Sequence, residues 1–356
     1  MSNVITGIGS YLPERVVTND EIEAMGVDFD RARAGSKSLD EWCRAHHGGV
    51  SRHWVAPGEA TSDMATHAAR RAMEDAAVQV EDIDLILMST ITNDYRLPQA
   101  AGIVQANLGS RAKFIQVDSA CTGFVDALMV ANGLMETQGY ETVLIVGADT
   151  LTYFNDPKKF RPLTVFGDGA GAVVLQKNHG DDFYGVKSFS TGSDGDLGDY
   201  VWVPGGASKK PFSQEVLENG LHYWRFKFPD IYTWAIERMC RCTQMAVEKS
   251  GLTLDEIRWV VPHQASTNII LDVARRLELP EEKFIITYPH TGNLSAASIP
   301  IALYEANDQR KFTDGDWLVM PSVGAGMAWG AVTYRWFDYR AVRDGKNGRE
   351  GEGVKT

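Results

Sequence analysis

The chain has 356 residues, enough for two domains or for one large layered unit whose core needs no disulfide or metal support. Its 47 acidic and 35 basic side chains give a formal charge of −12, which excludes a protein that coats nucleic acid. A hydrophobic share of 44% and only four cysteines exclude disordered and disulfide-scaffold classes. The sequence has no apolar run of about 18 residues and no secretory leader pattern, so we expect a cytoplasmic protein with no membrane partner.

Three short apolar runs in the first half of the chain predict buried strands. They are LILMST (85–90), KFIQVD (113–118) and VLIVGAD (143–149), and none of them alternates apolar with polar residues. Strands of this kind are buried on both faces and have helices between them. After the second run, apolar residues recur at helical spacing, so a helix is expected to follow it. The predicted fold class is therefore α/β.

The second half of the chain repeats the first. Four segments of similar pattern recur in the same order, about 170 residues apart: 72–89 with 246–263, 112–118 with 282–288, 141–149 with 316–324, and 166–176 with 323–334. A period this long excludes a solenoid. It indicates two similar α/β halves that pack into one molecule.

The composition changes between and after the two halves. Residues 179–225 are rich in Gly, Asp, Ser and aromatic residues, which predicts a loop insertion. Residues 341–356 are polar and rich in glycine, which predicts a disordered tail. The expected organisation is an N-terminal half over 1–178, this insertion, a C-terminal half over 226–340, and the tail.

Cys121 is the first candidate for chemistry. It lies in VDSACTGF, between the strand 113–118 and the helix expected after it. A helix N-terminus carries a positive dipole end, which stabilises a thiolate, although a buried structural cysteine also fits this position. The other three cysteines, Cys43, Cys240 and Cys242, lie in helix-like surroundings and are predicted to be structural. The last two cannot share one helix face, which argues against a metal site.

Two polar residues of the second half lie where strands give way to loops. His263 follows an apolar strand in VVPHQAS, and its counterpart in the repeat is Ser89, so the strand does not need the histidine. Asn293, in HTGNLSAAS, falls in the loop that corresponds to the loop of Cys121. A satisfied core histidine and a helix-capping asparagine are the structural alternatives. His290 is a second histidine candidate.

A glycine-rich turn, GAGMAWGA (324–331), completes the set, because its backbone N–H groups can converge on an oxyanion. Together these elements resemble the thiolase superfamily, and most closely the β-ketoacyl-acyl-carrier-protein synthase III family, from residue 7 to about residue 337. The motifs that carry the resemblance are SYLPERVVTNDEIE, DEW (40–42), ACTGF (120–124), FGDGAGA (166–172), VPHQAS (261–266), GNLSAASIP (292–300) and GAGMAWG (324–330). The resemblance implies a thiolase fold, a five-layered αβαβα arrangement of two duplicated halves, in a homodimer.

The resemblance also implies roles for particular residues. Cys121 would be the nucleophile of a triad with His263 and Asn293, and the backbone N–H groups of Cys121 and Ala325 would form an oxyanion hole. Cys121 would take an acyl group from acyl-CoA or from an acyl carrier protein, and a malonyl thioester would then be decarboxylated and condensed with it. Leu97 of one subunit would line the pocket of the other. No metal or cofactor is implied beyond the thioester substrates.

The chain departs from the family pattern around the entrance for substrate and carrier. The family has arginines at three positions where this chain has His46, Phe160 and Asn268, and residues 27–37 are an insertion. The substrate- and carrier-binding residues that the resemblance implies are these three with Trp42, Arg161, Arg275 and Arg276. We interpret the changes as those of a condensing enzyme of specialised, polyketide-like metabolism.

Other functions remain open from the sequence. One is the housekeeping enzyme that starts fatty-acid synthesis, and another is an acyltransferase of the same fold that passes the acyl group to a hydroxyl or an amine. Head-to-head condensation of two long acyl chains is a third. Retention of both His263 and Asn293 favours enolate chemistry over simple acyl transfer, which needs one general base. The presence of Cys121 argues against a non-catalytic partner subunit.

Overall fold

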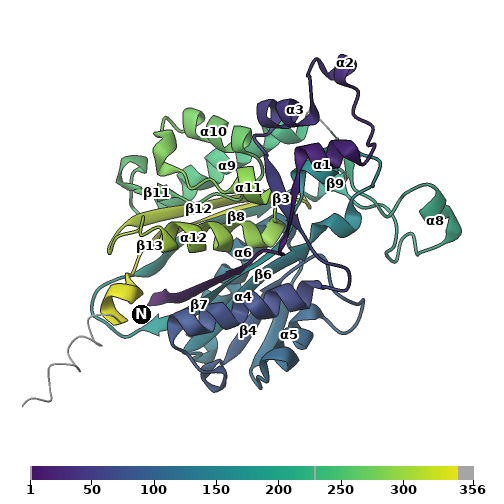
Figure 1. The fold of residues 1–356 in the computed structure, drawn as a ribbon. Helices are drawn as coiled ribbons and strands as arrows, with labels where there is room; N and C mark the ends of the chain where they lie inside the picture. The colour runs from purple at the N-terminus through teal and green to yellow at the C-terminus, as the bar shows by residue number, and fades with distance from the viewer. Residues whose placement is uncertain (1, 228–229, 344–356) are drawn as a thin grey trace, which may run out of the picture.

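The computed structural model describes residues 2–227 and 230–343, and each half of the chain builds one sheet (Figure 1). The first sheet has the order β1-β7-β6-β4-β5. In it, β4 runs parallel to β5 and β6, whereas β7 runs antiparallel to β1 and β6. Its strands are β1 (Ser2–Tyr11), β4 (Leu85–Ser89), β5 (Lys113–Val117), β6 (Thr142–Thr150) and β7 (Asp168–Asn178).

The second sheet repeats this order as β8-β13-β12-β11, and a single bridge between Val260 and Phe284 stands where the fifth strand would be. Its strands are β8 (Gly185–Ser193), β11 (Trp259–Val260), β12 (Trp317–Gly324) and β13 (Ala328–Arg335). Here β11 and β12 are parallel, and β13 is antiparallel to both of its neighbours. The long sequence repeat is therefore a repeat of strand order.

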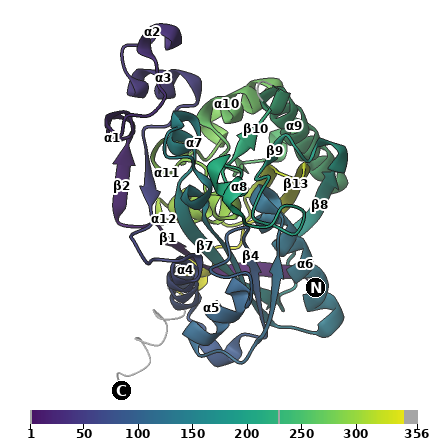
Figure 2. The same cartoon turned by 90° about the vertical axis from the view of Figure 1, so that its right-hand side faces the viewer.

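Helices cover both sheets and fill the space between them (Figures 1 and 2). On the outer face of the first sheet lie α4 (Thr61–Ala76) and α5 (Ala100–Leu108). The central layer is formed by α6 (Gly123–Gln138) and α12 (Ser298–Asp308), which contribute to one apolar core with strands of both sheets. The outer face of the second sheet is covered by α9 (Asp230–Lys249) and α10 (Thr267–Arg276). This is the expected αβαβα order.

The central layer joins the halves because its core is shared. Leu128 of α6 and Leu303 of α12 are fully buried together with Ile145 of the first sheet and Val332 of the second. Each buried aliphatic side chain of this size contributes roughly 1.5–3 kcal/mol. The loops that precede α6 and α12 are thereby held in fixed positions relative to each other.

A small cap lies beside this body. It comprises β2 (Arg15–Thr18), α1 (Asn19–Ala24), α2 (Arg31–Ala34), α3 (Leu39–His46) and β3 (Ser51–Trp54), and β2 pairs with β3. In Figure 2 the cap stands beside the central layer, with α2 of the 27–37 insertion at its far end. Further short helices are α7 (Phe160–Val165) and α11 (Tyr288–Thr291). Within 2–227 and 230–343, no helix combines the length and apolarity needed to cross a membrane.

Two expectations about the connecting segments are wrong in part. Residues 185–193, expected in the loop insertion, form β8, the counterpart of β1. Their sequence, GVKSFSTGS, is polar, and β8 pairs on one side only, so the apolar run typical of the other strands is missing. Residues 341–343 of the expected tail are helical, and Arg343 donates a hydrogen bond to the carbonyl of Asp75. The rest of the tail, 344–356, lies outside the described residues.

The remainder of the 179–225 segment also contains short elements. The strand β9 (Val201–Trp202) pairs with β10 (Arg225–Phe226), and the helix α8 (Gln214–Glu218) lies between them in sequence. Figure 1 shows α8 on a lobe that stands out from the body.

Candidate active site

A cavity of about 450 Å³ between the two halves is lined by Cys121, His263 and Asn293. Cys121 lies in the 3₁₀ turn η2 (Ala120–Thr122), directly before α6. Asn293 precedes the matching turn η7 (Ser295–Ala297), directly before α12. The structure thus brings together all three residues that were expected to form the triad.

The end of β12 passes directly beside the backbone of Cys121. A Cβ atom on Gly324 would lie 3.0 Å from the Cys121 nitrogen, closer than an ordinary van der Waals contact, so glycine eases this approach. The Ser322 hydroxyl donates a hydrogen bond of 2.7 Å to the Cys121 carbonyl. Ala325 lines the same cavity, which puts both residues expected to form the oxyanion hole at one site.

The thiol of Cys121 differs in one respect from the expectation. It lies at the start of a helix, but burial, together with the neighbouring Asp149 charge, raises its pKa to about 12. The helix dipole therefore does not by itself hold this side chain as a thiolate. Attack on a thioester needs a group that takes the thiol proton.

His263 is held as a neutral imidazole. Its side chain is 1% exposed, and burial lowers its pKa to about 3. Its backbone N–H donates to the Pro321 carbonyl at 2.8 Å, and its Nδ1 has no partner among the described residues. A neutral imidazole carries one ring N–H, so this side chain can donate a hydrogen bond into the cavity without adding charge.

Gln264, the residue after His263, was not identified as a site residue from the sequence. Its side chain holds the loop that follows His263 in place. Its Nε2 donates to the carbonyls of Pro262 and Ile285, and its Oε1 accepts from the backbone N–H groups of Thr287 and Tyr288. The side chain is fully buried. A polar amide directly after a strand-end histidine was the available signal.

Asn293 is pinned by its backbone and by its side-chain oxygen. Its N–H and C=O bond to the backbone over residues 165–167, and its Oδ1 accepts the Ser295 N–H at 2.8 Å. Asn293 is not the N-cap residue of η7 or of α12, so its oxygen closes the turn before η7, and the residue lines the cavity. His290, the second histidine candidate, is half exposed, pairs with Glu305 at 2.9 Å and does not line the cavity.

An aromatic cluster forms the entrance wall. Trp42 is only 7% exposed, because His46 stacks on it with ring centres 4.2 Å apart and Phe160 meets it edge-on at 5.0 Å. The Arg161 guanidinium lies 5.2 Å from the centre of the Trp42 ring. Trp42, His46 and Arg161 line the cavity, and Phe160 packs behind them.

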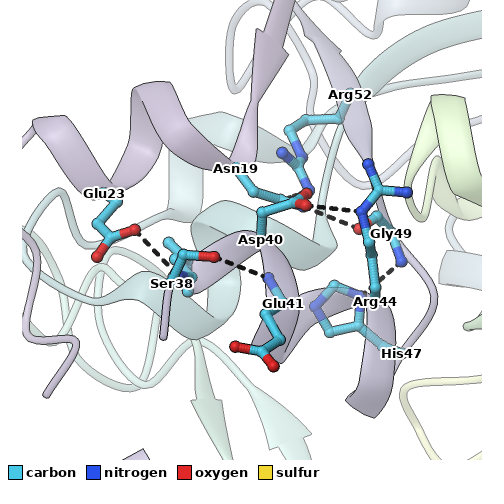
Figure 3. Close-up of polar contacts among 10 residues, drawn as sticks. Asn19, Glu23, Ser38, Asp40, Glu41, Arg44, His47, Gly49 and Arg52 are labelled. Atoms are coloured by element: carbon cyan, nitrogen blue, oxygen red, sulfur yellow. Dashed lines mark hydrogen bonds and ion pairs between the residues drawn. The ribbon is translucent and has the colours of Figure 1, made fainter. Parts of the chain in front are cut away.

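A buried arginine ties this wall to the body, and sequence reasoning missed it. Arg52 on β3 donates to the Val17 carbonyl at 3.1 Å, to Asn19 Oδ1 at 2.7 Å and to the Thr164 carbonyl at 2.6 Å. Figure 3 shows Asn19 between Arg52 and Asp40, the residue of α3 that also pairs with Arg44. Arg52 is thus the common link between β2, α1 and α7.

Replacing Arg52 by methionine is expected to destabilise the protein by about 2–4 kcal/mol, because two buried carbonyls lose their donor. Arg44→Met is the matched control, since Arg44 is exposed and its pair with Asp40 is worth less than about 1 kcal/mol. Denaturant unfolding followed by tryptophan fluorescence measures both variants. Equal effects of the two substitutions would contradict the role given to Arg52.

The expected carrier-binding residues of α10 lie on the surface. Asn268 donates to the Ala45 carbonyl at 2.9 Å and so ties α10 to α3. Both arginines of this helix have acidic neighbours: Arg275 pairs with Asp272 and Glu281, and Arg276 with Glu237. The local positive charge is therefore smaller than two arginines alone would give.

A second cavity, of about 860 Å³, adjoins the first. The residues common to both are Ile91, Ala120, Val201, Trp224 and Ala325. The second cavity is also lined by Tyr95 and Arg96, and the next residue in the chain, Leu97, is 83% exposed. Its walls come from loops far apart in sequence, so no local pattern predicted it. In the ranges 2–227 and 230–343, no cluster of three or more His, Cys, Asp or Glu is placed to hold a metal ion.

Comparison with known proteins gives consistent matches over this architecture. The family model described as 3-oxoacyl-[acyl-carrier-protein (ACP)] synthase III matches residues 115–195, and the model of its C-terminal part matches residues 247–336. The beta-ketoacyl-[acyl-carrier-protein] synthase III of Caldanaerobacter subterraneus subsp. tengcongensis is 38% identical over 333 residues, which cover 93% of this chain and 97% of that protein.

Solved structures agree with these matches. The 3-oxoacyl-[acyl-carrier-protein] synthase III of Aquifex aeolicus superposes with a TM-score of 0.84 at 32% identity, covering 94% of this chain and all of that chain. The priming β-ketosynthase of the R1128 polyketide biosynthetic pathway has a TM-score of 0.84 at 28% identity, covering 94% and 96%. The fold class expected from the sequence is thereby confirmed. The chain belongs to the β-ketoacyl-acyl-carrier-protein synthase III family, and it is a condensing acyltransferase of the thiolase fold.

Proposed function

We propose that this protein acylates Cys121 from an acyl thioester and condenses the acyl group decarboxylatively with a malonyl-type thioester, as a step of specialised, polyketide-like metabolism. The donors are acyl-CoA or an acyl carrier protein, and the scheme uses no metal or other cofactor. The main observation behind the proposal is that Cys121, His263 and Asn293 line one cavity between the halves.

The chemistry of each group supports its role. Cys121 attacks the thioester carbonyl, and the N–H groups of Cys121 and Ala325 bind the resulting oxyanion. His263 and Asn293 then donate hydrogen bonds to the malonyl thioester oxygen, where negative charge collects as carbon dioxide leaves. Two neutral donors suit this step, and the low pKa of His263 keeps its imidazole neutral.

The entrance wall supports the specialised assignment. The Trp42 ring is already covered by His46 and Phe160, two of the residues that replace arginines of the family. The entrance therefore recognises its thioester through a more aromatic and less cationic surface than the family pattern implies.

The loop 95–97 supports a homodimer. Tyr95 and Leu97 are both largely exposed, at 63% and 83%, beside the second cavity. Large exposed apolar side chains grouped in this way are typical of contact surfaces between proteins. In the proposed dimer, Leu97 of each subunit lines the cavity of its partner.

Intact-mass measurement with a panel of acyl thioesters tests the proposal. We expect the mass of one acyl group to be added to the wild-type chain and none to be added to Cys121→Ala. We also expect poor turnover with acetyl-CoA and malonyl carrier protein. Efficient turnover with that pair would refute the specialised assignment, and absence of an adduct with every thioester would refute the enzymatic role of Cys121.

A further inference from the structure

The insertion 27–37 reaches into the entrance wall, and the reaction described above gives it no role. Its aromatic ring, Phe29, packs against Phe160 with ring centres 5.2 Å apart and against Trp42 at 6.4 Å. Val27 of the same segment packs on the apolar cluster that contains Trp42. The start of the insertion is therefore part of the wall, although α2 itself stands at the far end of the cap (Figure 2).

Asp28 clamps the insertion to the residues that precede and begin α7. Its backbone N–H donates to the Lys158 carbonyl at 2.9 Å, and its Oδ1 accepts the Phe160 N–H at 3.0 Å. Its Oδ2 accepts a hydrogen bond from the Lys159 ammonium at 2.9 Å. One residue of the insertion thus fixes three consecutive residues, and with them the position of the Phe160 ring.

The other cover of Trp42 is fixed as well. His46 stacks on the indole with ring centres 4.2 Å and planes 15° apart, and its Nδ1 lies 2.8 Å from the Trp42 carbonyl. Since a carbonyl only accepts, Nδ1 carries the proton, and the ring cannot turn away without losing this bond. With these neighbours in place Trp42 is only 7% exposed. The ring that the stack presents to solvent is the imidazole of His46, which offers less stacking area than an indole.

Asp28 also neutralises a cation at the entrance. Lys158, Lys159 and Arg161 lie within four residues, and a run of cations of this kind suits the binding of phosphate groups. The Asp28 carboxylate pairs with Lys159, the central member of the run. A nucleotide is held by an aromatic face under its base and by cations around its phosphates. Asp28 therefore weakens both kinds of contact.

We infer that the insertion is a specificity element, in which Asp28 and Phe29 are positioning residues that keep the entrance from binding a nucleotide. The thioester that loads Cys121 is then one on a bare phosphopantetheine arm, as on an acyl carrier protein, and not one on coenzyme A. Both donors share this arm, and coenzyme A adds an adenosine nucleotide to it. The inference rests on the proposed acylation of Cys121 and narrows its donor to one class.

The test compares coenzyme A with phosphopantetheine, which is the same molecule without the nucleotide. Titration calorimetry gives the affinity of each for the whole chain and needs no acyl transfer. The ratio of the two affinities reports the nucleotide alone, because the arm is common to both. The same ratio is then measured for acylation, as kcat/KM with the two thioesters of the acyl group that labels Cys121 most strongly.

Five variants separate the clamp from the rest of the insertion. Asp28→Ala removes both side-chain bonds of the clamp, whereas Asp28→Asn keeps an oxygen for the Phe160 N–H and loses only an ion pair between two half-exposed side chains. Phe29→Ala and Phe160→Ala open the aromatic packing directly. Asp30→Ala is the matched control, because the Asp30 side chain holds α2 by accepting the Arg33 N–H. Thermal unfolding checks that each variant is folded.

We expect the wild-type chain to bind coenzyme A no more than about threefold more tightly than phosphopantetheine, since a base without an indole face gains little by stacking. Asp28→Ala, Phe29→Ala and Phe160→Ala should each raise this ratio by about tenfold, within the range known for one base stacked on an aromatic ring. Asp28→Asn should raise it less than Asp28→Ala. Asp30→Ala should leave it at the wild-type value.

Three outcomes would overturn the inference. A wild-type ratio of about tenfold or more would show that the nucleotide is recognised. A ratio that rises as far in Asp30→Ala as in Asp28→Ala would reduce the clamp to general support of the insertion. An unchanged ratio in Asp28→Ala, Phe29→Ala and Phe160→Ala would remove the specificity role. If no thioester acylates Cys121, the proposed function fails, and the calorimetric ratios still decide whether the entrance excludes a nucleotide.

Discussion

Replacing Cys121 by alanine is expected to lower condensation by at least about 10⁴-fold, because the acyl group then has no covalent acceptor. The variant should nevertheless release carbon dioxide from a malonyl thioester. His263 and Asn293 are held by contacts that do not involve the thiol, namely the Pro321 carbonyl for His263 and residues 165–167 for Asn293. Mass spectrometry of the chain and a carbon dioxide assay separate the two activities.

The control for this prediction is Cys242→Ala. Burial raises the pKa of the Cys242 thiol to about 12, as for Cys121, but Cys242 lies on α9 and lines neither cavity. Its removal should leave the acyl adduct in place. An adduct that persists in Cys121→Ala, or that disappears in Cys242→Ala, would show that another thiol is the nucleophile.

The strands and the layer order were predictable because they depend on local patterns. Apolar runs predict strands wherever they occur, so β4, β5 and β6 were found, but the expectation that all three are buried was wrong for β5, an edge strand whose residues are partly or fully exposed. The repeat then placed the loops of Cys121 and Asn293 at equivalent helix starts. The strand β8 was not found, because an edge strand that pairs on one side needs no apolar run.

The supporting residues of the site were not predictable in the same way. Arg52, Gln264 and Asp149 are polar side chains whose burial depends on partners far away in sequence. A sequence pattern shows that such a residue is present, but not that carbonyls or hydroxyls from other elements converge on it. The same reasoning explains the thiol of Cys121: its helix start was predictable, but the burial that raises its pKa was not.

The complementary prediction concerns the second half of the reaction. His263→Ala should still form the acyl adduct within about tenfold of the wild-type rate, but should lose decarboxylation and condensation by about 10²–10³-fold, the usual cost of removing one oxyanion donor. His290→Ala is its control, because that histidine pairs with Glu305 outside the cavity. Equal losses of adduct formation and carbon dioxide release in His263→Ala would instead make His263 the base for acylation.

Asn293→Asp sharpens this test, because it changes charge and leaves shape almost unaltered. An aspartate keeps the oxygen that accepts the Ser295 N–H, so the turn before η7 is preserved. It replaces the donor Nδ2 by a carboxylate oxygen, which repels the enolate that forms as carbon dioxide leaves. Its loss of decarboxylation should therefore be at least as large as that of Asn293→Ala, which removes the donor without adding charge. A milder effect of the aspartate would mean that the side chain at 293 serves the fold of the turn and not the developing charge.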